Sequence, residues 1–64
     1  MNEWTNKTTL LQAVEMDADS MVKMLFKLAR EFEGSKLATK ARACAEASME
    51  FLDEAAAVNR GEEA

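Results

Sequence analysis

Two stretches of the chain place apolar residues at alternating intervals of three and four positions, and the short polar break Gly34-Ser35 separates them. This heptad spacing is typical of helices that pack along one side. It predicts an all-α fold, an antiparallel helical hairpin with helices at about 9–33 and 36–58. The apolar positions are Leu11, Val14, Ala18, Met21, Leu25, Leu28 and Phe32, then Leu37, Ala41, Cys44, Ser48, Phe51, Ala55 and Val58.

The two rows match each other when the chain is folded at the break. Positions whose numbers sum to 69 pair a large residue with a small one in nearly every case, as Leu25 does with Cys44. With heptad letter a at Leu11 and d at Val14, each pair joins an a to a d, as antiparallel helices require. The pattern therefore predicts that the a and d rows form the hairpin contact. Cys44 is then a buried structural thiol.

Residues with strong capping preferences mark the helix ends. Thr9 is expected to cap the first helix, and Thr5 and Asn6 are alternatives that would start it one turn earlier. Gly34 suits the left-handed conformation that follows a helix, and Ser35 is a favourable N-cap for the second helix. We expect one domain, 1–64.

The ends of this domain, 1–8 and 60–64, are expected to fray. A core built from 64 residues rarely supplies more than ~3–5 kcal/mol without a disulfide, a metal or oligomerisation. The chain has one cysteine and no histidine, so an internal disulfide and the usual zinc ligand sets are excluded. The sequence therefore predicts that two hairpins associate as a homodimeric four-helix bundle.

A second group of apolar residues, at heptad positions e and b, lies beside the first. In an antiparallel pair the e rows of both helices flank the same side, so this group predicts one contiguous face. We interpret it as a surface for a second copy; a different protein, from a host or a phage, is the alternative. The predicted dimer or partner interface comprises Val22, Phe26, Ala29, Ala45, Met49, Leu52 and Ala56.

Charge is sorted along the chain. Residues 23–42 carry six basic against two acidic side chains, a local balance of +4, whereas 1–22 carry −3 and 43–64 carry −5. Folding gathers the basic residues near the turn and the acidic residues at the open end. A second hairpin packed antiparallel would place its basic turn beside the acidic open end of the first and so reduce the repulsion at both ends. The charges therefore predict the orientation of a two-fold dimer. The basic residues are Lys23, Lys27, Arg30, Lys36, Lys40 and Arg42.

Residue types that carry chemistry are scarce. Without histidine there is no Ser-His-Asp or Cys-His arrangement, and nothing basic is placed to activate Cys44. Glu46, Glu50 and Asp53 occupy an outward face without a histidine partner, so they do not predict a di-metal site. We expect no enzyme activity, no cofactor or metal, and no small-molecule substrate.

The expected partners are proteins. A net charge of −4 argues against broad affinity for nucleic acid. The six basic residues near the turn are nevertheless a possible phosphate-contacting patch, which keeps RNA binding as an alternative function. No apolar run approaches the length of a membrane span and no basic-then-apolar leader is present, so we expect a cytoplasmic protein.

The chain resembles two kinds of small protein. Its length, its two heptad helices around Glu33-Gly34-Ser35-Lys36 and its acidic tail Gly61-Glu62-Glu63 are similar to the Rop type of antiparallel hairpin dimer, which binds paired RNA loops. As a short, acidic reading frame without an enzymatic motif, it also resembles proteins of the lambdoid phage early region, in the bacterial host cytoplasm. These likenesses imply a small non-enzymatic regulatory or adaptor protein, with Rop-like RNA binding as the alternative.

Overall fold

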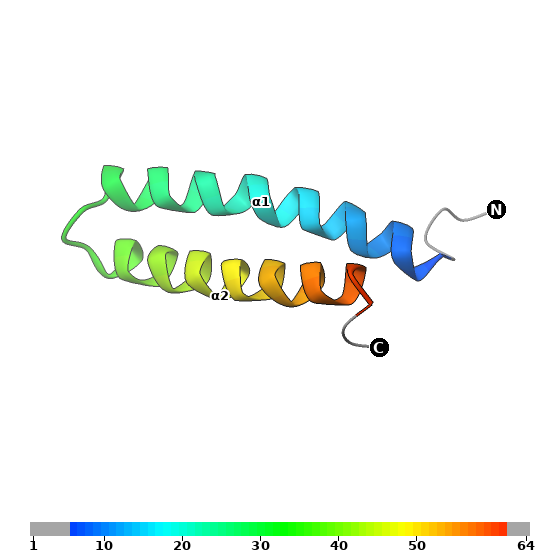
Figure 1. Ribbon diagram of the computed structural model, residues 1–64. Coiled ribbons are helices and arrows are strands. Elements are labelled where there is room, and N and C mark those ends of the chain that lie inside the picture. Colours follow the sequence, from blue (N-terminus) through cyan, green and yellow to red (C-terminus); the bar gives the residue numbers. More distant parts are fainter. Residues whose placement is uncertain (1–5, 62–64) are drawn as a thin grey trace.

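Two long helices lie side by side and run in opposite directions (Figure 1). The computed structural model describes residues 6–61, in which α1 spans Lys7–Glu31 and α2 spans Lys36–Asn59. The all-α hairpin predicted from the sequence is confirmed. Helix α1 begins and ends two residues earlier than the predicted 9–33, and α2 extends one residue past 58. Of the residues predicted to fray, Lys7 and Thr8 are helical, and residues 1–5 and 62–64 lie outside the described residues.

Helix α1 begins early because Asn6 caps it. The side-chain oxygen of Asn6 accepts hydrogen bonds from the backbone N–H groups of Thr8, at 2.8 Å, and Thr9, at 3.3 Å. Both donors belong to the first turn, where helical N–H groups have no partner within the helix. The structure therefore selects Asn6 rather than Thr9 as the cap.

The turn between the helices uses the conformations expected of Gly34 and Ser35. Gly34 has a φ of +88°, the left-handed region in which a side chain is unfavourable. Ser35 caps α2, since its Oγ accepts a 3.1 Å hydrogen bond from the backbone N–H of Ala38. The same hydroxyl donates to the carbonyl of Phe32 at 2.6 Å, which joins the end of α1 to the start of α2.

Alanine forms the core of this hairpin. Within residues 6–61, the buried hydrophobic side chains are all alanines, and no large side chain is fully buried. Ala29, Ala38 and Ala41 cluster near the turn, with Leu25 packed against them. Small side chains allow two helix axes to approach closely, so this contact is narrow and buries little apolar surface. The buried residues are Ala29, Ala38, Ala41, Ala45 and Ala55.

The helix contact follows the a and e rows, not the predicted a and d rows. Half-buried Val22 and Leu52 and buried Ala29 and Ala45 are all e positions. The d positions are exposed, and Cys44 is exposed as well, contrary to the buried thiol that the sequence predicted. Alanine at e explains the difference, because it lets the backbones approach where the bulky d side chains would hold them apart. The exposed d positions are Val14, Met21, Leu28, Leu37, Cys44, Phe51 and Val58.

Two polar contacts flank this alanine core. Near the turn, one guanidinium nitrogen of Arg42 lies 2.8 and 3.0 Å from the two carboxylate oxygens of Glu33. At the open end, the amide of Asn59 donates a 2.8 Å hydrogen bond to Glu15 in α1. Both contacts are exposed, so each contributes modestly to stability. The first contact joins α2 to the turn, and the second joins the two helices at the open end.

Candidate interaction surface

One side of the hairpin carries most of the exposed large hydrophobic side chains. The d rows of two antiparallel helices flank the same side of their contact, and the g rows lie next to them. Eight of the twelve exposed large hydrophobics of the described part belong to these rows, which we call the d/g face. An apolar face of this extent on a small protein indicates an interaction site. Its apolar members are Leu10, Val14, Met21, Met24, Leu28, Leu37, Phe51 and Val58.

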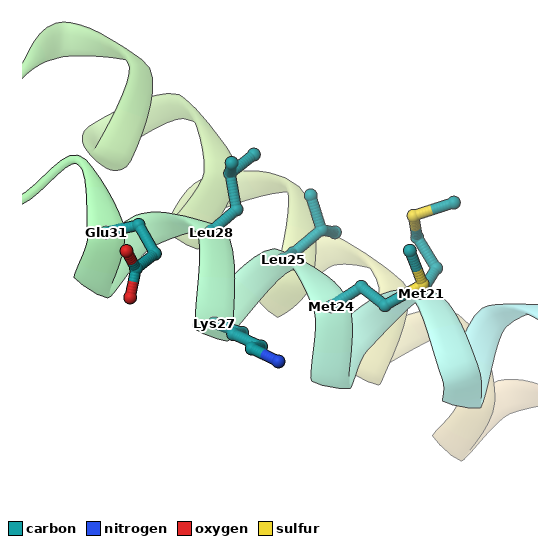
Figure 2. Close-up of a pocket in the computed structure, with 6 residues that line it drawn as sticks. All are labelled: Met21, Met24, Leu25, Lys27, Leu28 and Glu31. Carbon is teal, nitrogen blue, oxygen red and sulfur yellow. The ribbon is translucent and has the colours of Figure 1, made fainter.

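A pocket of about 430 Å³ lies on the α1 half of this face. Figure 2 shows Met21, Leu25 and Leu28 projecting to one side of α1, whereas Lys27 projects to the other edge. The flexible methionine side chains can adjust to the shape of an apolar partner. Lys27 and Glu31 add one charge of each sign at the margin of the pocket. Its lining residues are Met21, Met24, Leu25, Lys27, Leu28 and Glu31.

A second pocket, of about 360 Å³, lies at the open end of the hairpin. It is lined from both helices, by Lys7, Thr8 and Leu11 of α1 and by Val58 and Asn59 of α2. Leu11 is half-buried and Val58 is exposed, so the floor of this pocket is apolar while its edge is polar. The two pockets lie toward opposite ends of the hairpin.

The interface residues predicted from the sequence do not share one free face. Ala29 and Ala45 have no exposed surface, because both lie in the helix contact itself. Val22, Leu52 and Ala56 are half-buried. Only Phe26 and Met49, both at b positions on the side opposite the d/g face, are classed as exposed, with 36% and 39% of their surface accessible.

The basic residues near the turn are partly neutralised by neighbouring carboxylates. The ammonium of Lys23 lies 3.4 Å from Asp19, and Arg42 contacts Glu33. The other four basic residues are exposed, and Lys27 also lines the pocket on α1. The patch is therefore interrupted by acidic side chains rather than uniformly positive. Those four residues are Lys27, Arg30, Lys36 and Lys40.

Residues 6–61 contain no group of three or more histidine, cysteine, aspartate or glutamate side chains arranged to hold a metal ion. The thiol of Cys44 is exposed beside apolar d-row neighbours. Sequence reasoning missed the d/g face because it assigned the d row to the hairpin contact. Leu10 and Met24, two apolar residues in the otherwise polar g row of α1, were the signal that could have located it.

Comparison with known proteins provides no relative from which to transfer a function. No protein-family model matches this chain, and no curated protein or solved structure does so either. Neither helix in the described part of the chain has the length and apolar character needed to cross a bilayer. The d/g face is thus the feature from which a function is inferred.

Proposed function

We propose that this protein is a small non-enzymatic regulatory or adaptor protein that acts through protein–protein contacts, as a homodimer whose two hairpins form a four-helix bundle. The d/g face is the surface on which the second copy packs. The likeness to small phage early-region proteins extends the proposal to an accessory role, in which the dimer modulates host or phage development.

The observation that carries the proposal is the contrast between the core and the d/g face. The fully buried side chains of the described part are alanines, whereas leucines, methionines, valines and a phenylalanine lie exposed together. Burying one such large side chain stabilises a protein by about 1.5–3 kcal/mol relative to leaving it exposed. The eight side chains keep 37–62% of their surface accessible, so covering them adds a stabilising contribution that the alanine core of one hairpin lacks. A second copy supplies the missing half of the core.

Sedimentation of the purified chain at micromolar concentration tests the dimer. We expect a species of about twice the 7.1 kDa of one chain, with helix content that falls on dilution because folding and association are linked. Met21→Glu places a charge on the d/g face and should abolish the dimer. Met16→Glu, an identical change at an exposed site outside that face, should leave it intact. A folded monomer, or a Met21→Glu variant that still dimerises, would contradict the proposal.

RNA binding is the second candidate function. It is favoured by the four exposed basic residues near the turn, among them Lys27 and Arg30. A gel-shift assay with structured RNA and duplex DNA at near-physiological salt separates the two functions. An adaptor shifts neither nucleic acid. Selective micromolar binding to RNA that is lost on Lys27→Glu or Arg30→Glu would replace the adaptor function with RNA binding.

A further inference from the structure

We propose that α1 of one subunit packs antiparallel on α1 of the other, so that Leu10 and Val14 of the partner subunit fill the pocket formed by Met21, Met24, Leu25 and Leu28. This inference rests on the proposed homodimer and adds its orientation and register. It follows from three observations: the order of residues along α1, the position of the pocket, and the charges on α2.

The d and g rows of α1 match the same rows of a second copy that runs in the opposite direction. Consider α1 packed antiparallel on a copy of itself, with the two-fold axis at position 19. Every d residue then lies opposite a g residue of the copy, and the two residue numbers sum to 38. Three of the four pairs match chemically, and the fourth, Asp17 with Met21, lies next to the two-fold centre. The matched pairs are Leu10 with Leu28, Val14 with Met24, and Lys7 with Glu31.

The pocket lies where this register requires a cavity. Three of its lining residues, Met24, Leu28 and Glu31, are the members of the matched pairs that lie toward the turn. Their counterparts, Val14, Leu10 and Lys7, are exposed on the same face toward the open end. Two aliphatic side chains of the partner subunit then enter an apolar pocket, while its Lys7 approaches the carboxylate at the margin. Because the dimer is two-fold symmetric, each subunit inserts these two side chains into the pocket of the other.

Helix α2 is compatible with the same centre, although it pairs d positions with each other rather than with g positions. If α2 also packs on its copy, a centre between residues 47 and 48 brings Lys40 to within one residue of the level of Glu54. It also aligns Leu37 with Val58, and Cys44 with Phe51. Position 19 lies twelve residues before the end of α1, and this α2 centre lies about twelve residues after the start of α2. The centre derived from α1 therefore lies at the level at which Lys40 and Glu54 of the two copies come close.

The opposite orientation, with both turns at one end, is unfavourable on charge. It would stack two segments with a balance of +4 on each other and would gather the acidic segments at the other end. It would also place α1 over α2 of the partner subunit, with Met24 at the level of Cys44. The antiparallel orientation lays each basic turn over an acidic open end. This difference gives the two orientations distinct cross-linking partners.

Disulfide trapping in the dimer distinguishes them. On a Cys44→Ala background, Val14→Cys with Met24→Cys should yield a covalent dimer on mild oxidation, through two disulfides related by the two-fold axis. The two sites are ten positions apart on one helix, about 15 Å, so they cannot join within a chain. Met16→Cys with Met24→Cys, on the same background, is the matched control because Met16 lies outside the d/g face. We expect at least about tenfold more covalent dimer from the first pair, since paired thiols have a high effective concentration.

The outcomes separate failure of the homodimer from failure of the register. A monomer by sedimentation, for the native chain, overturns the homodimer and this register together. A native dimer in which Met24→Cys instead traps the native Cys44 leaves the homodimer standing and overturns the antiparallel register. A native dimer in which the Val14 and Met24 substitutions trap no more covalent dimer than the control also overturns the register. Efficient trapping by that pair alone establishes it.

Discussion

The side-chain amide of Asn59 donates a 2.8 Å hydrogen bond to the carboxylate of Glu15, across 44 positions of sequence. Both residues are e positions, one in the last turn of α2 and the other in the third turn of α1. Because the e rows of two antiparallel helices lie on the same side, these two side chains meet across the helix contact. The bond joins the two helices at the open end, while the buried alanines at e show that the contact runs along the a and e rows.

Removing this bond should loosen the open end. We expect Asn59→Ala to lower the free energy of unfolding by about 0.5–1.5 kcal/mol, because Glu15 loses its amide donor. Urea unfolding at one fixed protein concentration measures the change, since association contributes to stability. Gln12→Ala removes an exposed amide elsewhere in α1 and serves as the control. Equal stability of the two variants would argue against a bond between Asn59 and Glu15.

Gly34 should be the most sensitive glycine. Its φ of +88° strains any residue with a side chain, although a Cβ there would meet no atom within 4 Å. We therefore expect Gly34→Ala to cost about 1–2 kcal/mol of unfolding free energy, from backbone strain alone. Gly61, with a φ of +81°, has the same conformation and equally open surroundings, but it lies beyond the end of α2.

Gly61→Ala is accordingly the matched control for the turn. A strained residue beyond a helix end is relieved by fraying of the last turn, whereas the turn at Gly34 cannot open without separating the helices. Thermal unfolding should show a lower midpoint for Gly34→Ala than for Gly61→Ala. The reverse order would mean that the turn is less constrained than the open end.

The sequence determined which segments are helical and where they turn, but not which sides meet. Apolar residues occupy a, d and e, so the pattern is compatible with a contact along a and d or along a and e. The choice depends on size, because Ala29 and Ala45 at e allow a closer approach than Leu28 and Phe51 at d. Periodicity records which positions are apolar and not how closely two backbones approach. Because of the same ambiguity, the sequence assigns Ala29 and Ala45 to a partner interface, whereas the structure buries both in the helix contact.

Enlarging Ala45 tests which row closes the hairpin. Ala45 is fully buried, so Ala45→Leu should destabilise the protein by about 1–3 kcal/mol through overpacking. Ala43 is exposed two positions away, outside both the helix contact and the d/g face, and Ala43→Leu is the matched control with a small effect. Urea unfolding compares the two variants. A tolerated leucine at 45 would instead favour the a and d contact that the periodicity predicts.

Charge should set the strength and the orientation of the proposed dimer. In the antiparallel register, Lys40 lies level with Glu54 of the partner subunit, and Lys7 with its Glu31. Exposed ion pairs contribute about 0.2–1 kcal/mol each and weaken as salt screens them. We expect the dissociation constant, measured by sedimentation at several concentrations, to rise when ionic strength is increased. Dissociation that is insensitive to salt would remove the charge argument for orientation.

A charge exchange makes this prediction specific to one pair. Lys40→Glu should weaken the dimer, because the new carboxylate at position 40 then lies beside Glu54 of the partner subunit, and the two-fold axis repeats this repulsion. Adding Glu54→Lys should restore much of the lost affinity, since the pair is rebuilt with its signs exchanged. Arg30→Glu makes the same change in net charge on an outer row, so it should weaken the dimer less than Lys40→Glu does. If the double variant is no tighter than Lys40→Glu alone, Lys40 and Glu54 do not meet, and the register about the shared centre is wrong.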